Sequence, residues 1–168
     1  MPEKRTMERA RRDKRAGKAP STQAGEFVRE EMDHIREGKH GARSAKQAIA
    51  IGLSKARRAG VELKPPKAGS TSRRTRQSAA RDYARGHGEA PKRRSTAKRS
   101  QASERALKRE GQSAASPRAL SRQGHAAAAK RTPSDRSAAA RKAARTKGGG
   151  ARSAAARKAA RTRRMSLH

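Results

Sequence analysis

The 168-residue sequence contains no cysteine and no tryptophan, and its two aromatic residues are Phe27 and Tyr83. The lack of cysteine excludes a disulfide framework, a thiolate zinc site and a cysteine nucleophile. Two aromatic side chains are too few for the stacking platforms of RNA-recognition and single-strand-binding domains. No apolar run approaches the ~18 residues of a membrane span, and no hydrophobic stretch follows the basic N-terminus. We therefore expect a cytoplasmic protein with no membrane partner.

Acidic residues are scarce, and the charge is unevenly distributed. The chain has 46 Lys and Arg against 14 Asp and Glu, a formal net charge of +32. Residues 1–64 hold 17 bases and 9 acids, whereas residues 65–168 hold 29 bases and 5 acids. Arginine outnumbers lysine, 31 to 15, and guanidinium binds phosphate oxygens bidentately. Codon drift in GC-rich genomes also enriches Ala and Arg, but it does not account for this excess of charge, which indicates a nucleic-acid partner.

The convincing amphipathic pattern lies in residues 21–64, for which we predict a helical hairpin. Ser21 is the expected N-cap of the first helix, and Gly38 is expected to end it in a left-handed turn. Apolar residues with spacings of three and four share one face of this helix, namely Ala24, Phe27, Val28, Met32 and Ile35. The core is small for an independent domain, so we expect either a homodimer through the hairpin or a third helix near residues 75–85.

The second helix of the hairpin has its own start and stop signals. Ser44 and Gln47 have the spacing of a capping box, and Gly60 followed by Val61 is typical of a Schellman turn. Its apolar stripe consists of Ile49, Gly52, Leu53 and Ala56. The start of this helix could enter a major groove as in a helix-turn-helix motif, although short basic helices are common.

The rest of the chain is organised around this hairpin. We predict a basic N-terminal arm in residues 1–20 and a basic linker with short helices in residues 65–115. Residues 116–163 contain three 16-residue repeats rich in Ala, Arg and Lys, and residues 164–168 form the C-terminal end. The predicted fold class is mostly α without β-sheet: a small hairpin followed by a long basic tail that is disordered or transiently helical.

The repeats begin at Ser116, Thr132 and Gly148, and the last two share RSAAARKAART. Ser-Pro and Thr-Pro open the first two copies, which is the pattern of an N-cap followed by proline in the first helical turn. Because an isolated helix of about a dozen residues is marginal in water, we expect the free repeats to be largely unfolded. Binding to phosphate and helix formation would then be coupled.

On a helical wheel the cations of each repeat gather on one side, opposite a face of alanine. Such a helix lacks the apolar side chains that insert into a bilayer, but its cationic face suits phosphates. The predicted nucleic-acid-binding residues are Arg141, Lys142, Arg145, Arg157, Lys158, Arg161, Arg163 and Arg164 in the tail, and Lys46, Lys55, Arg57 and Arg58 in the hairpin.

The first helix of the hairpin also carries an acidic stripe, which consists of Glu26, Glu30, Asp33 and Glu37. These carboxylates repel one another unless cations lie beside them. We expect the stripe to bind the second helix or the protein's own tail, with a solvated face as the alternative. Acid–base catalysis by such carboxylates needs apolar walls that this chain lacks, so we predict no enzyme activity. The five histidines, His34, His40, His87, His125 and His168, are interpreted as solvated, and we expect no metal and no other cofactor.

The string SAKQAIAIGLSKARRAGVELKPPK, residues 44–67, carries a family resemblance. Together with the rest of residues 1–67 it resembles a family of small basic bacterial proteins that carry a domain of unknown function. The Ala-, Arg- and Lys-rich tail resembles those of linker histones. The resemblance implies a bacterial source and a DNA-associated role, and it transfers no catalytic residue.

These observations predict a nucleoid-associated, histone-like protein that binds and compacts duplex DNA without reading its sequence, by neutralising phosphates. Two alternatives remain open. The same tail could bind RNA or the ribosome, because no residue tests for a 2′-hydroxyl. Alternatively, the hairpin is a protein-interaction module that the tail merely localises.

Overall fold

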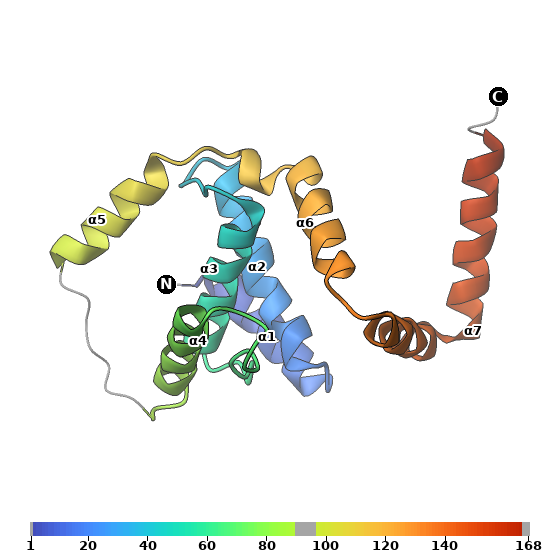
Figure 1. The fold of residues 1–168 in the computed structure, drawn as a ribbon, viewed down its shortest axis with the longest axis horizontal. Helices are drawn as coiled ribbons and strands as arrows, with labels where there is room; N and C mark the ends of the chain where they lie inside the picture. The colour runs from blue at the N-terminus through green and yellow to red at the C-terminus, as the bar shows by residue number, and fades with distance from the viewer. Residues whose placement is uncertain (1, 90–96, 166–168) are drawn as a thin grey trace. The chain divides into compact units, whose positions relative to one another are not determined.

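The computed structural model describes residues 2–89 and 97–165, with backbone alone for residues 146–149, 151, 152, 155, 164 and 165. The described residues form seven α-helices and one 3-10 helix, and they contain no β-strand (Figure 1). They divide into two compact units, Met1–Gln123 and Gly124–His168. The first unit is much larger than the hairpin that the sequence predicts.

The predicted hairpin is formed by α2 (Pro20–Arg36) and α3 (Ala45–Arg58), which pack against each other. Their backbones approach closely because Gly52 has no side chain: a Cβ there would lie 2.7 Å from the Val28 Cα. Gly38 has φ +74° and ends α2, as predicted. The prediction for Ser21 is wrong, because α2 has Pro20 in its first turn and Ala19, with no side-chain cap, at its N-cap.

The other local signals of the hairpin are confirmed. The Gln47 backbone N–H donates to Ser44 Oγ at 3.2 Å, and the Arg43 N–H donates to Gln47 Oε1 at 2.9 Å. Gly60 has φ +83°, and the Val61 N–H donates to the Ala56 carbonyl at 3.1 Å, which is the Schellman arrangement. The Gln47 side chain is thereby part of the capping box at the start of α3.

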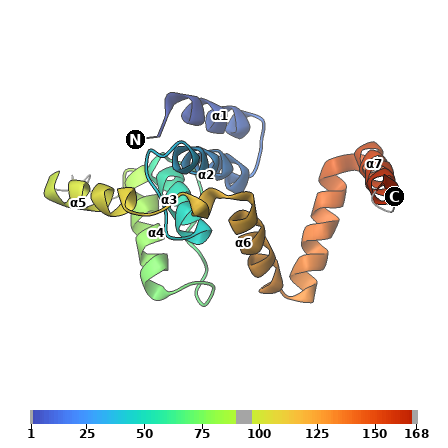
Figure 2. The ribbon, with the colours of Figure 1, turned by 90° about the horizontal axis from the view of Figure 1, so that it is seen from above.

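The N-terminal arm contains a helix, α1 (Lys4–Arg15), that packs on α2 (Figures 1 and 2). Thr6, Ala10 and Asp13 are buried on its inner face, and Lys18 pairs with Asp13 at 2.7 Å. This segment has few apolar residues, so its sequence indicates a basic arm but does not indicate that it packs on the hairpin. The arm therefore covers part of the hairpin.

A third helix, α4 (Arg73–Gly86), covers the residues where one was expected, and it packs on α3. Ser72 caps it by accepting a hydrogen bond from the Thr75 N–H at 3.2 Å. The packing is closest at Gly86, where a Cβ would collide with the carbonyl oxygen of Arg57. The helical hairpin is thus extended into a larger helical unit.

Part of the predicted linker also belongs to this unit. It contains α5 (Ala97–Lys108) and the 3-10 helix η1 (Ser113–Ala115). The start of α6 (Pro117–Ala129), in the first predicted repeat, belongs to the same unit. The backbone N–H groups of Gly41 and Ala42 donate to the carbonyls of Leu107 and Gly111 at 2.9 and 3.1 Å. The helix η1 packs against both α2 and α3.

The apolar core forms two clusters that share α2. One contains Phe27, with Ala10 from α1 and Ala56 from α3. The other contains Met32 and Ile35, with Ala114 and Ala115 from η1 and Leu120 of α6 at its edge. Helices outside the hairpin therefore enlarge the small core that suggested a homodimer, and the homodimer stays a prediction.

The second unit contains α7 (Pro133–Met165), a helix of 33 residues. Thr132 caps it by accepting from the Asp135 N–H at 3.1 Å, and Ser116 caps α6 by accepting from the Ala119 N–H at 3.2 Å, both as predicted. The expectation of a small hairpin with a disordered or transiently helical tail is wrong. The last two repeats form one helix, so a single unfavourable nucleation step is followed by favourable extension through many alanines, which are the best helix formers.

Candidate nucleic-acid interface

The second unit is almost purely cationic. From Gly124 to His168 the sequence has 13 Lys and Arg against one acid, Asp135. Seven of the eight predicted binding residues in the tail have described side chains, and all seven are exposed: Arg141, Lys142, Arg145, Arg157, Lys158, Arg161 and Arg163. Arg164 lies in α7 with its side chain outside the described part, and residues 166–168 of the predicted C-terminal end lie outside it altogether. The structure therefore presents these cations to solvent on a helix.

The cations of α7 form two clusters, one in each repeat. The first consists of Arg141, Lys142 and Arg145, and the second of Arg157, Lys158 and Arg161. Equivalent residues are 16 positions apart, so the two clusters lie about four turns apart along α7. Among the side chains that the structure describes, these cations thus form two clusters separated along the helix.

The four predicted cations of the hairpin have different environments. Lys46 and Arg58 are exposed, but Arg58 Nε donates to the Ser54 carbonyl at 3.2 Å and lies 3.8 Å from Asp82 Oδ1. Arg57 is buried, and its Nε donates to the Leu63 carbonyl at 3.1 Å. Burial lowers the pKa of Arg57, although the nearby Asp82 acts in the opposite direction. Arg57 is therefore engaged inside the protein, where its guanidinium holds the segment that follows α3.

The acidic stripe is paired within the first unit. Glu26 accepts from Arg9 Nε of α1 at 2.6 Å, and Glu30 accepts from the Glu3 backbone N–H at 3.1 Å. The exposed end of the stripe has local partners: Asp33 lies 3.3 Å from Arg36, and Glu37 lies 2.9 Å from Lys39. Helix α1, in the segment that was predicted only as a basic arm, is thus a major partner of the stripe.

The most buried acid of the protein is Glu31, which the sequence analysis did not select. Its carboxylate Oε2 lies 2.6 Å from Lys55 Nζ, and Glu30 Oε1 lies 3.6 Å from the same nitrogen. Lys55 is therefore engaged inside the protein. A signal was present, because Glu31 lies four residues from both Phe27 and Ile35, which places it on the apolar face of α2.

A hollow of about 530 Å³ lies beside this region, between α1, α3 and α4. Two exposed guanidinium groups, Arg58 and Arg85, contribute to its lining, together with Pro2, Met7, Lys55, Ala59 and Gly86. Guanidinium groups can bind phosphate oxygens bidentately. The first unit thus also presents exposed guanidinium groups, two of them beside this hollow.

Comparisons with protein-family models, curated proteins and solved structures give no match. Among the residues that the structure describes, no helix has the length and hydrophobicity needed to cross a membrane. The functional assignment depends on the charge and geometry described above.

Proposed function

We propose that the protein binds duplex DNA through its phosphates without reading the sequence, and that it compacts DNA as a nucleoid-associated, histone-like protein. The observation that carries this proposal is the exposed cationic surface of α7. Lys and Arg neutralise phosphates and release condensed counterions, which favours binding to any duplex. The resemblance of the head to basic bacterial proteins, and of the tail to linker histones, supports the same role.

The helical state of the second unit favours this binding. A chain that folds only upon binding loses conformational entropy at that step, whereas α7 already holds its cations in fixed order along a helix. Repulsion between the cations is relieved when phosphates approach, so binding stabilises the helix further. Binding therefore does not have to offset the entropy cost of forming this helix.

Two separate clusters also explain compaction. Because the two clusters lie about four turns apart along α7, they can contact phosphates of different strands or of different duplexes. Neutralisation of phosphates on two duplexes removes the repulsion that keeps them apart. One molecule could then bridge neighbouring segments of DNA.

The test is a fluorescence-anisotropy salt titration of the full-length chain with random duplex DNA. In one variant the six residues of the two α7 clusters are changed to Gln. A matched control changes six exposed cations of the first unit to Gln and removes the same charge: Lys4, Arg11, Arg12, Arg15, Lys64 and Lys67. A parallel titration with structured RNA tests the RNA alternative.

We expect the α7 variant to reduce the slope of log K against log salt by up to about 5, since each phosphate contact on duplex DNA contributes about 0.9. The control should change the slope much less. Equal losses in both variants would show that the charge of α7 has no special role. Tighter binding to RNA than to duplex DNA at equal salt would overturn the choice of DNA.

A further inference from the structure

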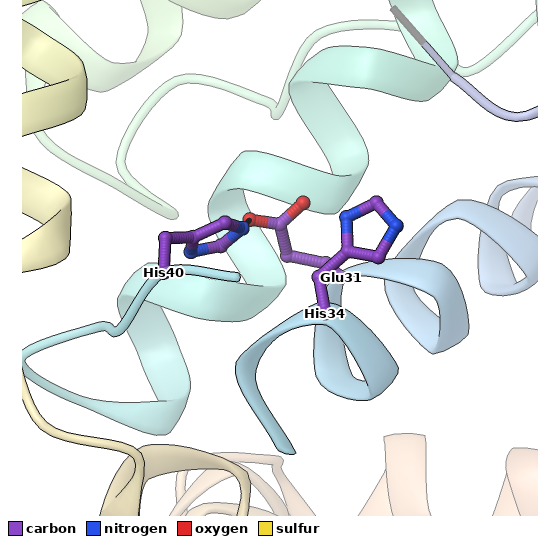
Figure 3. A group of neighbouring side chains, drawn as sticks. All are labelled: Glu31, His34 and His40. Carbon is purple, nitrogen blue, oxygen red and sulfur yellow. Dashed lines mark ion pairs between the residues drawn. The ribbon is translucent and has the colours of Figure 1, made fainter. Parts of the chain in front are cut away.

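A cluster of two histidines and a carboxylate lies in the first unit, where α2 ends and the chain turns toward α3. Glu31 and His34 come from α2, and His40 comes from the following loop (Figure 3). One potential ligand atom from each residue lies within 4.8 Å of the other two. The Glu-x-x-His spacing places the first two on one helical face, and the left-handed Gly38 turns the chain so that His40 returns to them.

The two imidazole rings are each fixed by a hydrogen bond on the nitrogen that faces away from the cluster. His34 Nε2 lies 2.9 Å from Glu3 Oε1, and His40 Nδ1 lies 3.1 Å from the Gly41 carbonyl oxygen. Carboxylate and carbonyl oxygens only accept, so these nitrogens carry the protons. The remaining nitrogens, Nδ1 of His34 and Nε2 of His40, are the ones that a metal ion could bind, and Figure 3 shows a nitrogen of each ring turned toward Glu31.

The two carboxylate oxygens of Glu31 also have different neighbours. Its Oε2 lies 2.6 Å from Lys55 Nζ, whereas its Oε1 lies 3.2 Å from His40 Nε2. Glu31 is fully buried, and both of its oxygens have ion-pair partners within reach but no hydrogen bond of good geometry from a described residue. Either a proton or a metal ion between Oε1 and His40 Nε2 would make their close approach favourable.

The local charge also favours a cation. Glu30 and Glu31 are both buried, and Lys55 is the one ammonium group paired with them. A buried carboxylate without compensation is unfavourable, so a second positive charge would stabilise the cluster. The side chains of His34 and His40 are 15% and 16% exposed, which leaves them accessible to an ion from solvent.

We propose that Glu31, His34 and His40 form a Zn²⁺ site. Imidazole nitrogen and carboxylate oxygen are both common zinc ligands, and some zinc sites consist of two His, one Glu and a water molecule. Glu3 and Gly41, which hydrogen-bond the two rings, and Lys55, which forms an ion pair with Glu31, would form the outer shell that orients metal ligands in proteins. Binding would draw the ligand atoms to about 3.3 Å from one another, since zinc–ligand distances are about 2.0–2.2 Å.

The bound ion would fasten the end of α2 to the loop that leads into α3. This loop also receives the backbone contacts of Leu107 and Gly111, so the site lies where three segments of the first unit meet. Zinc binding would therefore stabilise the first unit. The inference is independent of nucleic-acid binding, because none of its ligands is among the proposed DNA-binding residues.

The experiment measures Zn²⁺ binding to the untagged full-length chain by competition with a chromogenic chelator, together with the thermal midpoint with and without Zn²⁺. Co²⁺ serves as a spectroscopic probe, because its visible absorption reports coordination by protein ligands. The variants are His34→Gln and His40→Gln, with His125→Gln, an exposed histidine of the second unit, as the matched control. Circular dichroism of each metal-free variant verifies that the helices are retained.

We expect one Zn²⁺ per wild-type chain, a higher thermal midpoint with zinc, and a Co²⁺ spectrum that each ligand variant alters. Both ligand variants should weaken binding at least tenfold, whereas His125→Gln should behave as wild type. Glu3→Gln, which changes an outer-shell partner and no ligand, should weaken binding about tenfold. No binding by the wild type, or binding by both ligand variants as tight as that of the wild type, would overturn the proposal; the former would leave a proton as the cation between Glu31 and His40.

Discussion

Lys55 Nζ of α3 lies 2.6 Å from Glu31 Oε2 of α2 in the interior of the first unit. The lysine was predicted to bind nucleic acid, and the glutamate belonged to no predicted site. Their side chains are 19% and 1% exposed, so the pair is shielded from water and from salt. The two helices of the hairpin are therefore joined by a buried ion pair as well as by apolar contacts.

Loss of this lysine should destabilise the protein strongly. Lys55→Met leaves two buried carboxylates without their ammonium partner, for which we expect a loss of about 3–5 kcal/mol in the free energy of unfolding. Lys46→Met, at an exposed position of the same helix, should change it by less than about 0.5 kcal/mol. Urea unfolding monitored by circular dichroism measures both values, and equal stability of the two variants would show that the buried pair contributes nothing.

Two helical glycines should respond in opposite directions to alanine. At Gly52 the new Cβ would lie 2.7 Å from the Val28 Cα, so Gly52→Ala should separate the helices and destabilise by about 1–3 kcal/mol. At Gly25 a Cβ meets nothing within 4 Å, and Gly25→Ala should stabilise α2 by up to about 1 kcal/mol. The comparison uses the midpoint of thermal unfolding, and a higher midpoint for Gly52→Ala would contradict the close helix approach.

The cap of α7 tests whether this helix is defined by its own sequence. Thr132→Ala removes the hydroxyl that accepts from the Asp135 N–H, so the first turn of α7 should lose about 1 kcal/mol of stability and begin to fray. The matched variant Ser134→Ala leaves the cap intact. Carbon chemical shifts of residues 133–138 in the full-length chain report the helical population. Unchanged shifts in Thr132→Ala would show that the hydroxyl does not define where the helix begins.

The ion pair at the end of α5 predicts a pH dependence. A hydrogen bond from Lys108, 2.8 Å away, lowers the pKa of Glu104, helped by the charge of the ammonium. A carboxyl group with a lowered pKa stabilises the folded helix above its ordinary titration range, and this contribution disappears as the pH falls through the lowered value. Lys108→Gln should raise the pKa of Glu104 toward its ordinary value.

A carboxyl-carbon NMR titration measures this pKa directly. Lys98→Gln, at the start of the same helix, is the control and should leave Glu104 closer to its wild-type titration. If Lys108→Gln and wild type titrate alike, the ion pair does not form in solution.

Local start and stop signals were the part of the fold that could be predicted best. Gly38 and Gly60 have the predicted left-handed conformation, and Ser44, Ser116 and Thr132 accept hydrogen bonds as N-caps. These features depend on a few adjacent residues, so the sequence contains their whole cause. Ser21 is the exception, because Pro20 beside it also favours the first helical turn and moves the N-cap two residues earlier, to Ala19.

The extent of order could not be predicted from composition. Average hydrophobicity treats alanine as a weak contributor, yet Ala114 and Ala115 fill a core site against Met32 and Ile35 because η1 approaches α2 closely. Likewise, Arg57 and Lys55 count as surface charge in a sequence but occupy interior positions. His34 and His40 were interpreted as solvated, because their spacing matches no metal-binding motif and only the turn after α2 brings them together.

The sequence by itself determined the helical character of this protein, the caps of its helices and the strongly cationic second unit, because propensity, capping and charge act over a few residues. Tertiary structure decided which charges remain available. It buried Glu31 with Lys55, covered much of the acidic stripe with α1 and brought two histidines to one carboxylate. These relationships join residues far apart in the chain, and only the packing of helices against one another sets the distances between them.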